Sequence, residues 1–199
     1  MSTLSIKTGK GRASGRALIQ FVWLALCAIG LMWIARGAYI PAKAQLAQLL
    51  LERAFDQSVA SGRPVKPWGW ADTMPVARIG LGRLGVREVI LSGGTGQAMA
   101  FGPTKLATGS VSNVTMLAAH RDTHFAFIKQ ARVGDIITLD AISGRRVTYR
   151  VTGKQIVRWD QFALSRSYAR PTLGLVTCYP FGTSQHGPLR MVLWAQAIG

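Results

Sequence analysis

Acidic residues are scarce in this 199-residue chain, which has 8 aspartates and glutamates against 24 lysines and arginines. The acids are scattered singly, whereas a calcium site gathers several oxygen ligands in one place. Histidines and cysteines are rare as well. His120 and His124 lack the glutamate of a zinc-binding His-Glu-x-x-His motif, and no third ligand stands nearby. The sequence therefore predicts a protein that needs no metal ion and no other cofactor.

The basic excess lacks the marks of a nucleic-acid-binding domain. Its arginines are dispersed singly through strand-like segments, as at Arg78, Arg83, Arg132 and Arg150. No helix-turn-helix, zinc-finger spacing or aromatic stacking motif accompanies them. We therefore expect no nucleic-acid partner, and we interpret the charge as that of a domain close to anionic lipid head groups.

Charged side chains are absent from one long apolar run, residues 17–35. Its length is close to the roughly 20 residues that span a bilayer as a helix. All the charged residues before this run are basic, which predicts that residues 1–16 are a cytoplasmic tail and that the remainder of the chain lies outside. A cleaved signal peptide is the alternative, because Ala42-Lys43-Ala44 resembles a cleavage site. That site lies well past the run, and the run exceeds the roughly 7–15 apolar residues of a signal peptide, so we predict a single-pass anchor.

The two cysteines lie in segments of different character. Cys27 belongs to the membrane-length run, whereas Cys178 ends a strand-like stretch, so a disulfide between them is not expected. A single unpaired thiol is unusual in an exported domain, because oxidising compartments favour pairing. This favours a functional thiol at Cys178. The alternative is a buried cysteine that serves as a small apolar side chain.

The remainder of the chain divides into a connector and a β domain. Residues 36–73 are predicted to form a juxtamembrane helix, with Pro41 near its start, and then an extended segment that contains Trp68 and Trp70. From residue 74 onward, short segments rich in strand-forming residues alternate with glycine-containing turns. The predicted strands cover residues 76–81, 86–91, 114–119, 136–141, 147–151, 155–159, 173–178 and 190–196. Residues 74–199 are thus predicted to be a mainly β domain, an antiparallel barrel or a sandwich.

Three reactive groups stand at or near the ends of predicted strands. Cys178 follows Leu175-Val176-Thr177, and the segment 173–190 contains no acid, so the local charge favours a thiolate. His120 ends an apolar strand and enters a polar loop, where an imidazole can transfer protons. Arg190 begins the last strand, and its guanidinium can hold developing oxyanion charge. Together these residues predict a thiol transpeptidase site.

Each of these residues has a structural alternative. His120 can be a structural or solvent-exposed histidine, and Arg190 can be a surface arginine. His186, in a loop eight residues beyond Cys178, is a spare candidate base. Asp122 can orient an imidazole, although its closeness to His120 in sequence does not establish a contact.

The combination resembles the sortase family of membrane-anchored cysteine transpeptidases. That family has a histidine at a strand end, then Thr-Leu-x-Thr-Cys, then an arginine on the next strand. The matching segments are Ala119-His120-Arg121, Leu175-Val176-Thr177-Cys178 and Leu189-Arg190. Residues 62–68, 119–125 and 177–181 resemble the proteobacterial branch, and the resemblance extends from about Ala44 to the C-terminus. Gly174 departs from the usual threonine, which leaves the packing of its strand open.

The resemblance implies an eight-stranded β-barrel with short helices, carried on a transmembrane helix in the inner membrane, with the catalytic domain in the periplasm. It implies that Cys178 is the nucleophile, His120 the general acid and base, and Arg190 the oxyanion- or substrate-binding group, with Asp122 and Thr177 as supporting residues. The partners would be a substrate protein with a C-terminal sorting signal similar to Leu-Pro-x-Thr-Gly and an amine acceptor. The loops at residues 93–109 and 179–188 would shape the peptide groove.

Other functions remain open at this stage. The same three residues with water as the acceptor would make a membrane-anchored thiol peptidase. A non-catalytic anchored β-domain would bind a partner or lipid and would not need Cys178. An L,D-transpeptidase fits less well, because the Ser-His-Gly-Cys pattern of those enzymes is absent from the sequence.

Overall fold

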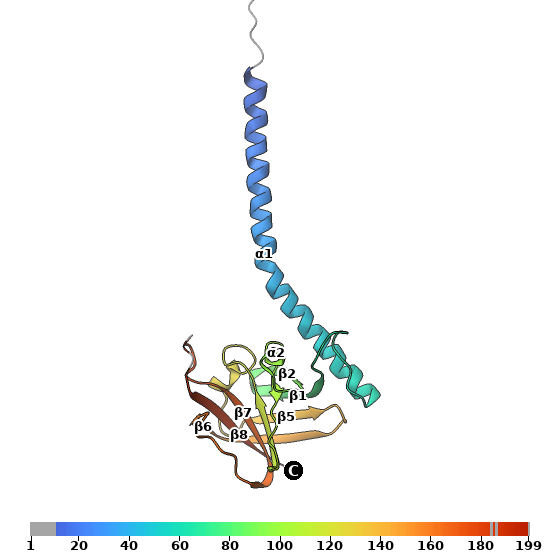
Figure 1. Cartoon of the computed structure of the whole chain (residues 1–199), viewed down its shortest axis with the longest axis vertical. Helices are drawn as coiled ribbons and strands as arrows, with labels where there is room; N and C mark the ends of the chain where they lie inside the picture. Colours follow the sequence, from blue (N-terminus) through green and yellow to red (C-terminus); the bar gives the residue numbers. More distant parts are fainter. Residues whose placement is uncertain (1–10, 184, 186, 199) are drawn as a thin grey trace, which may run out of the picture. The chain divides into compact units, whose positions relative to one another are not determined.

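The computed structural model describes residues 11–183, 185 and 187–198. The chain divides into two units, Met1–Leu46 and Ala47–Gly199, and the long helix α1 (Gly11–Ser61) contributes to both (Figure 1). His186, the spare candidate base, lies outside the described residues.

The first unit consists, in its described part, of the N-terminal portion of α1. Its large apolar side chains are exposed, for example Phe21 at 71% and Trp33 at 68%. Of the described helices, this one alone is long and apolar enough to cross a membrane. A signal sequence near an N-terminus can pass the same test of helix length and hydropathy, so the anchor stays a prediction.

The juxtamembrane helix does not begin afresh at Pro41. Pro41 lies inside α1, and the two predicted helical segments form one continuous helix. The residues that follow Pro41 are mostly alanine, leucine and glutamine, which favour helix strongly. A proline within such a sequence removes one backbone hydrogen bond and can bend the helix without ending it.

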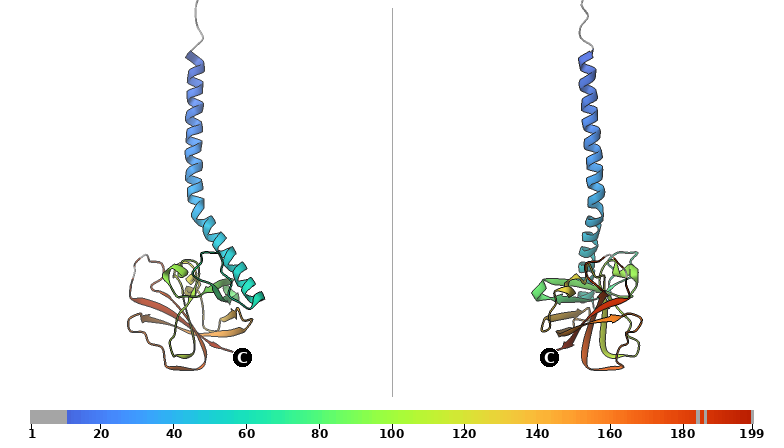
Figure 2. Two further views of the ribbon diagram at one scale, coloured as in Figure 1. Left: turned by 45° about the vertical axis from the view of Figure 1, so that its right-hand side comes forward. Right: turned by 90° about the vertical axis from the view of Figure 1, so that its left-hand side faces the viewer.

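The second unit is built around a closed eight-stranded barrel, which confirms the predicted fold (Figure 2). The strands are β1 (Pro75–Leu81), β2 (Val86–Leu91), β3 (Thr104–Lys105), β4 (Ser112–Ala118), β5 (Ile136–Ala141), β6 (Arg146–Arg158), β7 (Ser167–Cys178) and β8 (Leu189–Ala197). They close in the order β1-β2-β3-β4-β7-β8-β6-β5. Three short helices interrupt the connections: η1 (Gly82–Leu84), α2 (Gly96–Met99) and η2 (Ala126–Lys129).

One strand pairing decides where the reactive residues lie. β4 and β7 run parallel, with Leu117 opposite Leu175 and Ala118 opposite Val176. The short pair β2–β3 is parallel too, whereas the other neighbouring pairs have the antiparallel arrangement that the strand pattern favoured. Parallel neighbours need a long crossover, which β5 and β6 provide. As a result, the C-terminal ends of β4 and β7 lie side by side.

The barrel interior is apolar and follows the two-residue period of strands. In β1 every second residue is buried, including Ile79 and Leu81. Leu117, Leu173 and Leu193 from β4, β7 and β8 are also almost fully buried and belong to the same cluster. This packed interior supplies the rigid support from which the strand ends project.

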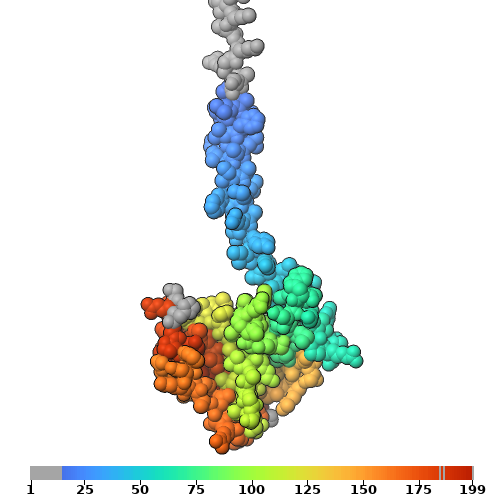
Figure 3. All heavy atoms as spheres, in the orientation of Figure 1, coloured from blue at the N-terminus to red at the C-terminus, as the bar shows by residue number. Residues whose placement is uncertain are grey.

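The C-terminal part of α1 covers part of the outer surface of the barrel (Figure 3). Leu51 and Phe55 pack against Val89 and Leu91 of β2. Trp68 adds to this cluster through an edge-on contact with Phe101, whose ring centroid lies 5.2 Å away. This places Trp68 in the domain, as expected for a large aromatic side chain, whereas Trp70 is 87% exposed.

Gly174 is explained by its neighbours on the adjacent strands. It lies between Met116 of β4 and Trp194 of β8. A β-carbon at this position would lie 2.7 Å from Met116 Cε and 3.0 Å from Trp194 Cζ3. Two large side chains thus fill the space that a threonine would need, and the departure from the family pattern is compensated locally.

Candidate active site

The parallel β4–β7 pair brings His120 and Cys178 to the same end of the barrel. Beyond the last β4 residue, the Ala119 amide still donates to the Val176 carbonyl, at 3.2 Å. His120 follows at once, and Cys178 is the last residue of β7. On the other side of β7, Cys178 is the register partner of Arg190, the second residue of β8. Three neighbouring strands therefore present the three predicted reactive residues together.

These residues line one cavity of about 400 Å³. Its walls are formed by His120, Arg121, Asp122, Thr123, Cys178, Gln185, Gly187 and Arg190. Cys178 and Arg190 are half-buried, and His120 is exposed. The thiol is free, as expected, and so is that of the exposed Cys27. The cavity thus combines an unpaired thiol, an imidazole and a guanidinium that a bound peptide can reach.

Thr177 lies beneath the cavity. Its side chain is buried, and its hydroxyl donates a 2.8 Å hydrogen bond to the carbonyl of Ala119. Because Ala119 directly precedes His120, this bond ties the backbone of the histidine to the strand that carries the cysteine. The geometry gives the predicted supporting residue a structural connection to both.

The Arg190 guanidinium is held by backbone carbonyls. Its Nη1 donates to the carbonyl oxygens of Gly187 and Leu189, both at 2.8 Å. Within the described residues, its Nη2 and Nε have no other hydrogen-bond partner. An arginine has five N–H donors in a fixed plane, so donors remain for a carbonyl or an oxyanion in the cavity.

Arg121 is the site residue that the sequence reasoning did not single out. It is only 9% exposed, although it is charged. Its Nε donates to both carboxylate oxygens of Asp122, at 3.1 and 2.9 Å. Its Nη1 donates to the Pro180 carbonyl at 2.6 Å, and its Nη2 donates to the Thr183 carbonyl. Its only signal in the sequence was its place in Ala119-His120-Arg121, because residue type alone does not indicate burial.

Asp122 lies in the cavity wall with its carboxylate directed to Arg121. The hydrogen bonds of the described residues include none between Asp122 and His120, so an orienting role toward the imidazole stays a prediction. The other nearby histidine is paired elsewhere: His124 Nδ1 lies 2.8 Å from Glu88 Oε2. Among the described residues, no group of three histidine, cysteine or acidic side chains could hold a metal ion.

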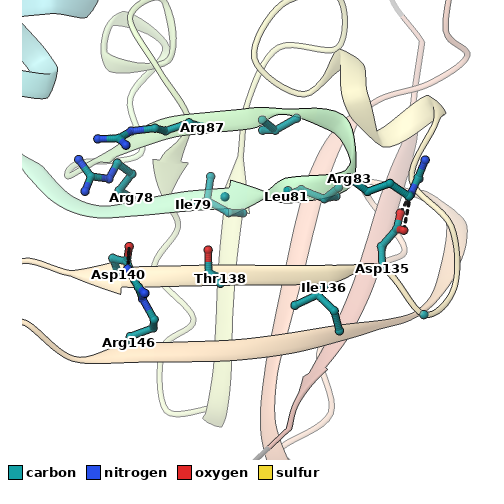
Figure 4. A pocket seen from close by; sticks show the side chains of 14 residues that line it. Arg78, Ile79, Leu81, Arg83, Arg87, Asp135, Ile136, Thr138, Asp140 and Arg146 are labelled. Carbon is teal, nitrogen blue, oxygen red and sulfur yellow. Dashed lines mark hydrogen bonds and ion pairs between the residues drawn. The ribbon is translucent and has the colours of Figure 1, made fainter.

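A larger cavity, of about 650 Å³, lies on the outer face of β1, β2 and β5 and shares no lining residue with the first (Figure 4). Its arginines are paired with acids. Arg83 Nε lies 2.6 Å from Asp135 Oδ1, and Arg146 Nε lies 2.5 Å from Asp140 Oδ1. The Arg83 guanidinium lowers the pKa of Asp135 to about 2. Since its lining contains no thiol or imidazole, this cavity lacks the chemistry of the Cys178 site.

A family model described as the sortase domain matches residues 79–198. The chain belongs to the sortase family. The match includes all three predicted reactive residues and the whole barrel from β1 to β8, apart from the first residues of β1. The resemblance inferred from the short motifs is thus confirmed at the level of the family.

Solved sortases share the fold of this sortase at low sequence identity. Sortase A from Corynebacterium diphtheriae has a TM-score of 0.56 and 17% identity, over 65% of this chain and 63% of that one. Sortase C-1 from Actinomyces oris has a TM-score of 0.52 and 22% identity, over 63% and 75%. Sortase C from Clostridium perfringens SM101 has a TM-score of 0.52 and 16% identity, over 79% and 90%. This sortase therefore spans less than two thirds of the Corynebacterium protein. No curated protein matches it in sequence.

Proposed function

We propose that this sortase is a membrane-anchored cysteine transpeptidase that cleaves a C-terminal sorting signal similar to Leu-Pro-x-Thr-Gly. It transfers the cleaved protein to an amine acceptor. The observation that carries the proposal is the single cavity lined by Cys178, His120 and Arg190. A nucleophile, a proton-transfer group and an oxyanion donor are the groups that acyl transfer through a covalent intermediate requires.

The first half of the reaction forms a thioester. The Cys178 thiolate attacks the carbonyl carbon of the threonine in the sorting signal, so a carbon–sulfur bond forms and the carbonyl oxygen becomes an oxyanion. Nη2 and Nε of Arg190, which have no partner among the described residues, hold that oxyanion. The amide carbon–nitrogen bond then breaks, and protonated His120 gives its proton to the departing glycine amine. The thioacyl enzyme and the free C-terminal peptide result.

The second half releases the acyl group. An amine acceptor attacks the thioester carbonyl, and His120 accepts the proton that the amine loses. The carbon–sulfur bond breaks, a new amide forms, and Cys178 returns to the thiolate. Water in place of the amine would give a free carboxylate, which is the outcome expected of a thiol peptidase.

A membrane anchor would raise the effective concentration of a membrane-bound substrate at the active site. We assign residues 1–16 to a cytoplasmic tail, 17–35 to a span of the inner membrane, 36–73 to the connector and 74–199 to the periplasmic catalytic domain. The apolar, exposed surface of α1 supports this assignment. A substrate tethered to the same membrane reaches the site at high effective concentration without additional contacts.

Intact-mass spectrometry of the full chain in detergent tests the proposal. The protein is mixed with a Leu-Pro-x-Thr-Gly-type peptide, and Cys178→Ala serves as the matched variant. We expect a mass increase equal to the acyl fragment that is absent from the variant and that an added amine discharges as an amide. Discharge to the free acid despite the amine would indicate a peptidase. No adduct across a panel of related peptides would refute the proposal, provided that peptide mapping shows that Cys178 itself still reacts with iodoacetamide, because the exposed Cys27 also carries a free thiol.

A further inference from the structure

The Arg121 side chain joins two loops that form opposite walls of the active-site cavity. Arg121 itself lies in the turn after β4, beside His120. Its Nη1 and Nη2 reach the carbonyl oxygens of Pro180 and Thr183, in the loop that leads from Cys178 to Arg190. In the described part of the chain, no other hydrogen bond connects the 120–125 turn with the 179–188 loop.

Below these loops, the strands are already tied together. The Ala119 amide and the Thr177 hydroxyl connect β4 and β7 at the base of the cavity. Beyond the strand ends, the Tyr179 amide donates to the Leu189 carbonyl, and Phe181 packs against the barrel core. Among the described residues, Arg121 alone makes hydrogen bonds from the histidine turn to the 179–188 loop, which also carries Gly187, whose carbonyl accepts from Arg190.

The contact requires the shape of a guanidinium. Arg121 serves a carboxylate on its Nε and two carbonyls on its two terminal nitrogens, and an arginine presents these donors in one rigid plane. A lysine carries the same charge on a single rotating ammonium, so it cannot bridge three separated acceptors. The side chain is also buried, which makes an unpaired replacement costly.

We propose that Arg121 is a positioning residue that holds the two walls of the cavity at the separation required for acyl transfer. Asp122 acts through Arg121, by fixing the plane of its guanidinium, instead of acting on the His120 imidazole. This inference rests on the proposed function of the Cys178 site. Displacement of reacting groups by about 1 Å can cost roughly 10²-fold in rate, so loss of the link should appear mainly in kcat.

Arg121→Lys, measured in the full chain in detergent, tests this inference against Arg83→Lys. Arg83 is the control with the same kinds of partner, because it also binds both oxygens of an aspartate, Asp135, and a backbone carbonyl, that of Gln130, at a more exposed position outside the Cys178 cavity. With the sorting peptide, we expect Arg121→Lys to lower kcat roughly 10–100-fold with a smaller change in KM. Arg83→Lys should leave both constants within about twofold, because small displacements matter for catalysis only where they reach the reacting groups.

A second readout does not depend on activity. Chymotrypsin cleavage at the Phe181–Gly182 bond, followed by mass spectrometry, reports opening of this loop, because Phe181 packs against the barrel core and lies between the two carbonyls that Arg121 binds. We expect Arg121→Lys to accelerate this cleavage several-fold at a temperature where both variants remain folded, as checked by thermal unfolding. Unchanged cleavage would overturn the inference. Accelerated cleavage in a protein whose wild type forms no acyl adduct would retain the link and refute only the proposed function.

Asp122→Asn distinguishes the two roles of the carboxylate. If Asp122 acts through Arg121, the variant should lower kcat in the same direction as Arg121→Lys and leave the pH profile of kcat/KM in place. If Asp122 instead contacts the His120 imidazole directly, orienting it and stabilising its protonated form, the pH profile of kcat/KM should shift in Asp122→Asn and stay fixed in Arg121→Lys. The latter pattern would overturn the assignment.

Discussion

Replacing Gly174 with threonine should destabilise the barrel, even though threonine is the usual residue of the family at this position. The new β-carbon would lie 2.7 Å from Met116 Cε and 3.0 Å from Trp194 Cζ3. Met116 has a flexible end but is only 3% exposed, so it must move into packed surroundings. The Trp194 ring is confined by Tyr168 and Phe162, whose centroids lie 6.1 and 6.2 Å away.

The expected magnitude follows from this crowding. Overpacking of a filled site costs about 1–3 kcal/mol. In a domain of this size, each kcal/mol lowers the melting temperature by about 2–4 °C. Gly174→Thr should therefore lower Tm by roughly 2–12 °C, and Gly174→Ala should lie near the lower end, because alanine adds the β-carbon alone.

Thermal unfolding of the full chain in detergent measures the shift in Tm, and urea unfolding, followed by tryptophan fluorescence, measures the change in the free energy of unfolding. The decisive comparison is a double-mutant cycle with Met116→Ala, which removes the side chain that the threonine would strike. We expect the double variant to be more stable than the sum of the two single effects predicts, by at least about 1 kcal/mol. Additive effects, or a Gly174→Thr protein as stable as the wild type, would show that Met116 and Trp194 are not the reason for a glycine at position 174.

Two further predictions concern Thr177, the neighbour of Cys178, and Asp135, which lies outside the Cys178 cavity. Thr177→Val should remove the 2.8 Å bond to the Ala119 carbonyl, lower stability by about 1–3 kcal/mol and reduce kcat, as measured by urea unfolding and peptide kinetics. Retained kcat would show that this bond does not place His120. The pKa of Asp135 is lowered from 3.8 to about 2, chiefly by its hydrogen bonds to Arg83, so its ionised form stabilises the fold above pH 3.8. The stability difference between wild type and Asp135→Asn should shrink as the pH falls from about 4 to about 2. A difference that stays constant over this range would refute that linkage.

The strand positions were predictable because their cause is local. Alternating β-branched and aromatic residues between glycine turns marked most of the barrel. Two predicted segments, 147–151 and 155–159, merged into the single strand β6, which has a register irregularity between Val151 and Gly153. The two-residue strand β3 lies in the glycine-rich segment predicted as a loop, and it is too short to leave a pattern.

Pairing and burial were harder to predict, because they depend on residues distant in sequence. Nothing local to β4 shows that its partner is β7, or that the two run parallel. Cys178, His120 and Arg190 were nevertheless singled out as candidates, since their residue types and strand-end positions suggest chemistry without any knowledge of the pairing. Arg121 was not, because its importance lies in carbonyl groups contributed by a loop nearly sixty residues away.

The parallel pairing of β4 and β7 also determines the order in which the site is assembled. Its contacts join residues separated by more than fifty positions, and β8 must then dock to bring Arg190 beside Cys178. Such a site has a high contact order, and non-local pairings of this kind form slowly. A chain that emerges N-terminus first can pair β4 with β7, and so bring Cys178 beside His120, before β8 adds Arg190. The three candidate residues are therefore together only once the last strand has docked.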